Sequence, residues 1–406
     1  MARIGIFGGS FNPPHNGHIS AANNAVSMLK LDRLLLIPTA TPPHKQMSAD
    51  APSAEHRLAM LKLAAKQIAD AEVCDLEILR GGTSYSVDTL RILRAQYPND
   101  ELFFIMGTDM LLSFRQWHLP EQVVKLAQIV CLHRQQPNDK LCEAMAQEKT
   151  WIEENGGKCI LCENPVVELS STMVRRMLFF GCAQPYLPQS ILDYILERGL
   201  YCTKDSVKGL PFDALKEYSL RLHDEKRVPH AIGTSQYCKE LALQFGADPV
   251  QAERAGILHD VTKALKPAQH FALCEHLHVD ISPEQRDNPK LLHALTGAAV
   301  AEHIFGECDA VVAAIRSHTT GTGQMSTLQK ILYIADYAEP NRDFPGVEYL
   351  RGALEHSLEQ AVLMGLEMTM QQLREKNAVI CRDTLAAYES LTKERNGDSA
   401  IHETLW

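Results

Sequence analysis

The sequence predicts an α/β domain with a parallel sheet, followed by a second domain that is all α-helical. The chain has 406 residues, about two to three times the length of a typical single domain. In its first half, short apolar runs alternate with amphipathic segments, a rhythm typical of a parallel sheet. Beyond Tyr201 this strand-like pattern almost disappears and successive helical patterns follow. Two domains of different class are therefore expected.

Five segments of the first half are predicted strands: Arg3–Gly8, Arg33–Pro38, Glu72–Leu79, Glu101–Gly107 and Ile129–His133. The apolar segment Lys158–Leu169 is predicted as a further strand. The polar stretch Thr203–Pro211, with its Gly and Pro, predicts a domain boundary. Helices are expected beyond it, for example over Ala247–Leu265 and Gln329–Tyr337. The expected domains are residues 1–203 and 204–395, followed by a polar C-terminal tail over 396–406.

The composition predicts a protein that folds in water. Hydrophobic residues make up 45% and charged residues 22% of the chain, which excludes a mainly disordered, fibrous or membrane-embedded protein. The net charge of −10 argues against a nucleic acid polymer as partner, so local cations, metals or backbone amides must bind an anionic substrate. Scattered cysteines, and no apolar stretch near the roughly 18 residues of a membrane span, favour a cytoplasmic protein with no membrane partner. Whether it forms a homo-oligomer stays open.

The first predicted strand runs into a glycine-rich turn that leads to two histidines. The turn contains Gly8, Gly9, Ser10 and Phe11, and the histidines His15 and His18 stand at the start of a helical pattern. A strand, a glycine-rich turn and a helix amino terminus together bind anions, because free N–H groups and the positive end of the helix dipole converge there. The histidines can face the same way and donate hydrogen bonds to a phosphate. A nucleotide site is therefore predicted.

A second motif, Ser170-Ser171-Thr172-Met173-Val174-Arg175, can cap a helix and place an arginine one turn further on the same face. With both motifs, residues 1–202 resemble the bacterial nicotinate-mononucleotide adenylyltransferases, within the nucleotidyltransferases that carry a His-x-Gly-His motif. The resemblance implies a Rossmann-like nucleotidyltransferase sheet, with ATP and nicotinate mononucleotide as substrates and deamido-NAD and pyrophosphate as products. The implied ATP-binding residues are Gly8, Gly9, Ser10, Phe11, His18, Ser170, Ser171, Thr172 and Arg175. The implied catalytic residues, acting with Mg²⁺, are His15, His18, Lys45 and Arg175.

The acceptor nucleotide is expected to bind residues of four further segments, which follow the family's order along the chain. The implied nicotinate-nucleotide-binding residues are His44, Thr83, Tyr85, Asp109, Trp117 and Arg134. The Trp117 face can stack on an electron-poor pyridinium ring. The same scaffold serves other adenylyltransferases and cytidylyltransferases, so a different acceptor is the alternative for this domain.

The second half carries six potential metal ligands of two chemical types. They are His230, His259, Asp260, His293, His318 and Asp336. Adjacent residues on a helix point about 100° apart, so His259 can face one ion while Asp260 bridges two. Imidazoles with carboxylates suit Fe, Mn or Zn, and two such ions can bind a phosphate and activate a water.

These residues occur in a pattern that resembles the HD metal-dependent phosphohydrolases, specifically their bacterial YqeK-type branch, over about residues 212–390. The resemblance implies a helical HD domain with two divalent metals, expected to be Fe, that hydrolyses dinucleoside polyphosphates such as diadenosine tetraphosphate to ADP. Arg227, Lys263 and Arg342 are expected to contact the substrate phosphate. A non-catalytic nucleotide sensor is the alternative for this domain. No metal is assigned to the pair Cys159 and Cys162, which the apolar segment around them predicts to be core or edge residues.

Overall fold

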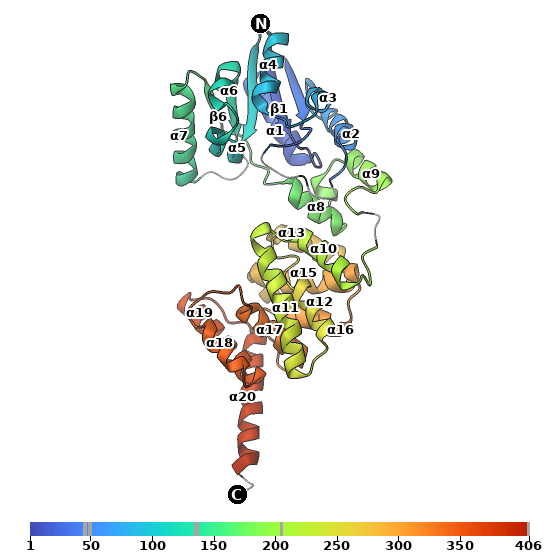
Figure 1. Cartoon of the computed structure of the whole chain (residues 1–406), viewed down its shortest axis with the longest axis vertical. Helices are drawn as coiled ribbons and strands as arrows, with labels where there is room; N and C mark the ends of the chain where they lie inside the picture. Colours follow the sequence, from blue (N-terminus) through green and yellow to red (C-terminus); the bar gives the residue numbers. More distant parts are fainter. Residues whose placement is uncertain (44–46, 48–50, 134–137, 204–205, 404–406) are drawn as a thin grey trace. The chain divides into compact units, whose positions relative to one another are not determined.

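The structure is a computed structural model that describes residues 1–43, 47, 51–133, 138–203 and 206–403 (Figure 1). The chain forms two compact units, Met1–Asp205 and Ser206–Trp406, which are described separately below. Unit 1 contains a six-stranded sheet, and the described part of unit 2 contains helices and no strand. The predicted fold class is confirmed. No helix within the described ranges is long and apolar enough to cross a membrane.

The sheet of unit 1 is parallel throughout, with the strand order β3-β2-β1-β4-β5-β6. Its strands are β1 (Arg3–Gly9), β2 (Arg33–Pro38), β3 (Ala71–Val73), β4 (Glu101–Gly107), β5 (Gln128–Leu132) and β6 (Cys159–Cys162). The order reverses between β1 and β4, because connections leave these two neighbours in opposite directions. In such sheets ligands bind in the crevice at the carboxyl ends of the strands, at this reversal. The glycine-rich turn after β1 starts there.

Helices flank the strands of unit 1 (Figure 1). They are α1 (Asn16–Leu29), α2 (Ala54–Ala65), α3 (Leu76–Arg80), α4 (Ser86–Gln96), α5 (Thr108–Leu112), α6 (Pro120–Leu126), α7 (Asp139–Glu154), α8 (Ser171–Phe179) and α9 (Gln189–Arg198), with short 3₁₀ helices η1 (Phe114–Gln116) and η2 (Gln184–Tyr186). Five of the six residues of β2 are buried. Strands of parallel sheets are covered on both faces, which explains the continuous apolar run from Leu34 to Ile37.

Two predicted strands are wrong in extent, and both lie at the edges of the sheet. The segment Glu72–Leu79 forms a strand only to Val73 and then turns into helix α3. The segment Lys158–Leu169 forms a strand only over β6, because Asn164 binds the backbone of His133 through both side-chain atoms, at 2.7 and 3.0 Å. These bonds replace the next rungs of the ladder. The strands predicted at Arg33–Pro38 and Glu101–Gly107 have the predicted bounds.

Unit 2 is built of helices that pack around a core of alanine, leucine, isoleucine and valine side chains. They are α10 (Phe212–Leu222), α11 (Val228–Phe245), α12 (Pro249–Leu258), α13 (Pro267–His276), α14 (Pro283–Asp287), α15 (Leu292–Val300), α16 (Asp309–Ser317), α17 (Thr327–Ala338), α18 (Val347–Leu354), α19 (Leu358–Glu375) and α20 (Arg382–Glu403), with η3 (Glu225–Arg227), η4 (Pro289–Leu291) and the π-helix η5 (Ala301–Phe305). Helix α20 continues into the segment 396–406 that was expected to be a tail.

The predicted helix Ala247–Leu265 is wrong at its C-terminal end. Helix α12 ends at Leu258, His259 is its C-cap, and turns follow. Gly256, in the last turn, packs directly on helix α11: a Cβ there would lie 2.6 Å from the Cα of Ser235. The adjacent residues His259 and Asp260 therefore stand at the end of the helix rather than on its face.

Candidate functional sites

The first candidate site begins at the junction of β1 and α1. His15 is the N-cap of α1, and its backbone N–H donates to Nδ1 of His18 at 3.3 Å. The two imidazole rings lie 3.8 Å apart between centroids. Because Nδ1 of His18 accepts this bond, the proton of the neutral ring is on Nε2, which can donate to a phosphate. Gly17 allows this arrangement, since a Cβ there would lie 3.0 Å from Nδ1 of His15.

The serine motif, which lies near the end of unit 1 in the sequence, contacts the residues that follow the glycine-rich turn. Ser170 caps helix α8 by accepting the N–H of Met173 at 3.2 Å. Ser171 Oγ donates to the carbonyl of Pro13 at 3.0 Å, across 158 residues of sequence. Arg175 Nη1 donates to the carbonyl of Asn12 at 2.8 Å. The structure therefore brings the two predicted nucleotide-binding motifs together.

A buried arginine that the sequence analysis missed braces the glycine-rich turn. Arg57 on α2 is 2% exposed and donates to the carbonyls of Ser10 at 2.9 Å and Ala40 at 3.3 Å. Burial lowers the pKa of its guanidinium, which still keeps its proton at neutral pH. Arg57 thus fixes the turn after β1 relative to the segment after β2. Nothing in its helical sequence context distinguishes it from a surface arginine.

The predicted acceptor segment around Thr83 lies beside the residues that follow β2. The backbone N–H of Ser84 donates to the carbonyl of Thr41 at 2.9 Å, and Ser84 Oγ accepts the N–H of Ala40 at 3.0 Å. Thr83 itself is exposed and pairs with Thr41 in an isolated bridge. This places Thr83 next to the start of the proline-rich turn. His44 and Lys45 of that turn, and also Arg134, lie outside the described residues.

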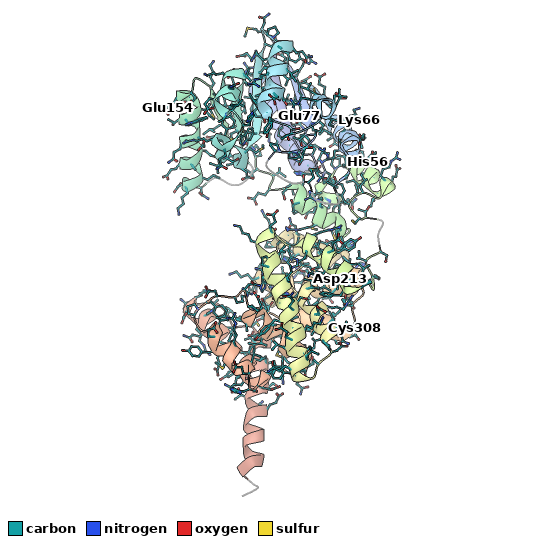
Figure 2. All side chains as sticks on the ribbon, viewed as in Figure 1. His56, Lys66, Glu77, Glu154, Asp213 and Cys308 are labelled. Atoms are coloured by element: carbon teal, nitrogen blue, oxygen red, sulfur yellow. The ribbon has the colours of Figure 1, made fainter. Side chains whose placement is uncertain are left out.

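A buried carboxylate on α3 supports the start of α4. Glu77 on α3 (Figure 2) is 5% exposed and accepts a hydrogen bond from Thr89 Oγ1 at 2.7 Å. Burial raises the pKa of its carboxyl group. Glu77 and Thr89 thereby tie α3 to α4 on either side of the acceptor segment.

Aromatic side chains lie near Tyr85, which is in the same acceptor segment. The ring of Tyr85, at the N-cap of α4, lies 4.5 Å from the imidazole of His118, a residue to which the sequence analysis gave no role. Trp117 is half-buried against Phe114, with centroids 5.2 Å apart. Asp109 is exposed in the first turn of α5, directly after β4. Trp117 therefore packs on the core and remains partly accessible, so it can also contact a ligand.

The second candidate site is in unit 2, where four histidines are oriented in one way. Three of them direct Nδ1 at the backbone carbonyl three residues earlier, each at 2.7 Å: His259, His293 and His318. The fourth, His230, directs Nδ1 at Oε1 of Glu339, at 3.1 Å. In each ring Nδ1 carries the proton and Nε2 is left with a lone pair, which is the usual arrangement of metal-binding histidines.

Asp260 lies between two pairs of these histidines. Its Oδ2 is 3.4 Å from Nε2 of His259 and 4.0 Å from Nε2 of His230. Its Oδ1 is 3.5 Å from Nε2 of His293 and 3.7 Å from Nε2 of His318. One carboxylate therefore presents one oxygen to each pair. This is the geometry that a carboxylate needs to bridge two ions.

Asp336 completes the first pair, since its Oδ1 lies 3.0 Å from Nε2 of His230 and 3.8 Å from Nε2 of His259. Burial alone would raise the pKa of the Asp260 carboxyl group, but His259, His318 and nearby Lys263 outweigh it and hold that pKa well below its usual range. Burial would raise the pKa of the Asp336 carboxyl group too, but His230, His259 and Arg342 hold it below its usual range, so both carboxylates are ionised at neutral pH. Four imidazoles and two carboxylates are a donor set that suits Fe, Mn or Zn, so these residues fit two divalent cations.

The predicted phosphate-binding residues surround this cluster. Arg227 forms an ion pair with Asp260, and Arg342 forms one with Asp336 at 2.5 Å. Lys263 Nζ lies 2.8 Å from Nε2 of His293, and burial lowers its pKa. Three cationic side chains next to the ligands provide a setting for a polyphosphate. The structure thus brings together all nine residues predicted for this site.

Glu339, three residues after the candidate ligand Asp336, was missed by the sequence analysis. It is fully buried, and its Oε2 accepts the N–H of Asn341 at 2.8 Å and the side-chain amide of Asn341 at 2.9 Å. Its other oxygen orients His230. A glycine makes room for this pair, because a Cβ at Gly233 would lie 2.6 Å from Nδ2 of Asn341.

Cys159 and Cys162 lie on the edge strand β6 and are buried. Burial raises the pKa of the Cys159 thiol to about 11. Among the described residues, the groups of side chains that could hold a metal ion all belong to the cluster in unit 2.

Comparison with known proteins assigns each unit to a family. The cytidylyltransferase-like family profile matches residues 6–177, and the HD domain profile matches residues 227–341. A protein of Mycoplasma pneumoniae, named probable nicotinate-nucleotide adenylyltransferase/Ap4A hydrolase, is 33% identical over 83% of this chain and 88% of its own length. The nicotinate-nucleotide adenylyltransferase of Bacillus subtilis is 36% identical over 50% of this chain and 99% of its own.

Among solved structures, an HD superfamily hydrolase of Clostridium acetobutylicum, described as involved in NAD metabolism, is 33% identical with a TM-score of 0.44. The matched region covers 46% of this chain and 98% of the chain of that hydrolase. The match to the Mycoplasma protein extends through both units. The chain therefore belongs to the same family as that protein, with a cytidylyltransferase-like domain followed by an HD domain.

Proposed function

We propose that the chain is a bifunctional enzyme. Unit 1 transfers AMP from ATP to nicotinate mononucleotide, giving deamido-NAD and pyrophosphate. Unit 2 hydrolyses dinucleoside polyphosphates such as diadenosine tetraphosphate to ADP. The shared family with the Mycoplasma pneumoniae adenylyltransferase/Ap4A hydrolase supports both activities. The observation that carries the hydrolase is Asp260, whose two oxygens face separate pairs of histidines.

In unit 1 the reaction needs no protein nucleophile. A phosphate oxygen of the acceptor attacks the α-phosphorus of ATP in line, and pyrophosphate leaves with the bonding electrons. In this proposal His18 donates from Nε2 to the phosphate that gains charge, which the bond to its Nδ1 supports, and the amino termini of α1 and α8 add backbone N–H donors. Mg²⁺ bound with ATP would neutralise further charge. Arg175 holds the two helix termini together through Asn12.

In unit 2, the proposed reaction is attack of water on a phosphorus of the polyphosphate chain. With diadenosine tetraphosphate, one water and one substrate give two molecules of ADP. His230, His259 and Asp336 would hold one divalent cation, His293 and His318 the other, and Asp260 both. Two such cations, for which we propose iron, supply charge neutralisation and a more acidic water. Arg227, Lys263 and Arg342 bind and orient the phosphates.

The two activities can be tested in one full-length protein with two variants that control each other. Asp260→Asn keeps the size of the side chain but removes the charge shared between the histidine pairs. We expect it to abolish ADP formation from diadenosine tetraphosphate and to leave the synthesis of deamido-NAD at the wild-type rate. His18→Ala should do the reverse. The two reactions are followed by separating the nucleotides chromatographically.

Several outcomes contradict the proposal. Bound metal without turnover of any dinucleoside polyphosphate would make unit 2 a nucleotide sensor. Preferred use of phosphopantetheine as acceptor, or equal kcat/KM for nicotinate mononucleotide and its amide, would overturn the assignment of unit 1. A carboxylate can accept backbone N–H bonds that a carboxamide satisfies only in part, so a clear preference for the acid is expected.

A further inference from the structure

A cavity of about 290 Å³ extends from the metal-ligand cluster of unit 2. Its lining residues are of two kinds. Near the cluster they are polar or charged: Lys263, Thr319, Asp336 and Arg342. The remaining ones are two aromatic side chains and an amide: Tyr337, Phe344 and Gln372. The roles proposed above for the cationic residues leave the aromatic part of the cavity unexplained.

The two aromatic rings form a corner, and further contacts hold the ring of Tyr337. The rings of Tyr337 and Phe344 lie 6.4 Å apart at an angle of 81°. The hydroxyl of Tyr337 donates to Thr369 Oγ1 at 2.7 Å, and Thr369 in turn donates to the carbonyl of Gly365 at 2.8 Å. Tyr333 stacks on Tyr337 at 5.6 Å. Tyr337 is therefore held in place, and a flat ligand can stack on one ring of the pair and touch the edge of the other.

Gln372 adds a hydrogen-bonding group to this corner. It lies on α19, three residues after Thr369 and hence on the same side of the helix. It is exposed, and its side-chain amide has no hydrogen-bond partner among the residues that the structure describes. An amide of this kind offers one donor and one acceptor, the pair that matches N7 and the N6 amino group of adenine.

We infer that Tyr337, Phe344 and Gln372 form the subsite for one purine base of the substrate. Arg342 and Lys263, in the same cavity, then contact the phosphates between that base and the metal ligands. The volume is at the lower end of small-molecule pockets, so the cavity takes one nucleoside and leaves the second nucleoside of a dinucleoside polyphosphate outside. This inference rests on the function proposed for unit 2, because it names the part of the substrate that the same site recognises.

The test is the binding of ADP and of inorganic pyrophosphate to the full-length, Mn²⁺-loaded protein by calorimetry. The variants are Gln372→Leu and Phe344→Leu. The matched control is Gln371→Leu, which changes a neighbouring exposed glutamine whose amide binds Glu375 at 3.0 Å and which does not line the cavity. Unit 1 is identical in all these proteins, so any difference between their isotherms comes from unit 2.

Loss of the amide should weaken ADP binding at the site in unit 2 about fivefold, and loss of the Phe344 ring should weaken it about tenfold. Pyrophosphate, which has no base, should bind all variants equally, and Gln371→Leu should match the wild type. Unchanged ADP binding in both variants, or absence of a second class of ADP sites in the wild type, overturns the inference. Equal weakening of ADP and pyrophosphate overturns it too, because the residues then only support the metal ligands.

This measurement is separate from the test of hydrolysis. Binding of ADP through these residues without cleavage of any dinucleoside polyphosphate would support the base subsite and contradict the proposed hydrolase activity. Cleavage of the substrate by the wild type, together with normal ADP binding by the variants, would support the hydrolase activity and contradict the base subsite.

Discussion

Replacing Glu339 by glutamine changes the partner of His230 without changing the size of the side chain. Both oxygens of the buried carboxylate accept hydrogen bonds: Oε1 from Nδ1 of His230 at 3.1 Å, and Oε2 from Asn341 at 2.8 and 2.9 Å. An amide has one oxygen and one NH₂ group, so in either orientation one N–H donor faces another. The substitution also removes the negative charge that makes His230 a stronger ligand.

The expected loss of metal affinity depends on which histidines are oriented by Glu339. Loss of a side chain that orients a metal-binding histidine typically weakens metal binding about 10- to 100-fold. His259, His293 and His318 direct Nδ1 at backbone carbonyls, which the substitution does not touch. We therefore expect Glu339→Gln to weaken one of two metal positions at least about tenfold and to leave the position of His293 and His318 unchanged.

The assay is a titration of the full-length protein with Mn²⁺, in which the free ion is counted by electron paramagnetic resonance. Two metal positions are expected in the wild type. In the variant, one of the two should bind Mn²⁺ more weakly. Glu217→Gln is the control, because Glu217 is an exposed glutamate on α10 that pairs with Arg221 at 2.5 Å. Equal weakening of both positions, or wild-type affinity at both, would refute the role given to Glu339.

Three further outcomes are expected. His18→Ala should lower kcat for deamido-NAD synthesis about 100- to 1,000-fold with little change in KM for ATP, and an unchanged kcat in steady-state kinetics would remove His18 from the catalytic residues. Gly233→Ala should weaken the same metal position as Glu339→Gln in the Mn²⁺ titration, since its Cβ displaces the pair of Glu339 and Asn341; normal affinity would contradict this. Burial lowers the pKa of His270 to about 4, against about 6.5 in an unfolded chain, so the unfolded state binds the proton first and stability is lost as pH falls from about 6.5 to 4. Between pH 7 and pH 5 this loss is about 2 kcal/mol; it should be absent in His270→Asn, and hydrogen exchange of α13 at both pH values measures it.

The sequence predicted the central strands well because their signal is local. β2 and β4 are buried on both faces, so each appears as a continuous apolar run bounded by polar residues. The edge strands were predicted too long, since the end of a strand with one neighbour depends on contacts such as those between Asn164 and His133, 31 residues apart. The apolar pattern of a segment does not reveal such a contact with a distant residue.

The sequence named every candidate metal ligand that the structure brings together in unit 2, but it did not name Glu339, the side chain that orients one of them. The difference lies in the range of the contacts. His259, His293 and His318 find their partners three residues earlier in the chain, so any sequence that places the histidine also places its partner. His230 finds Glu339 across 109 residues. Only the packing of α11 against the segment after α17 shows that this glutamate faces the histidine.

Residues 336–344, which comprise the end of α17 and the segment after it, connect the two halves of the proposed site in unit 2. Asp336 is a candidate metal ligand, Glu339 orients another, Arg342 is the proposed phosphate-binding residue beside Asp336, and Tyr337 and Phe344 line the proposed base subsite. These nine consecutive residues thus carry groups proposed to bind the metal, the phosphate and the base. Movement of this segment would change metal binding and nucleotide binding together, and such linkage is reciprocal. ADP should therefore tighten the metal position that Glu339 supports by the same factor by which the metal at that position tightens ADP.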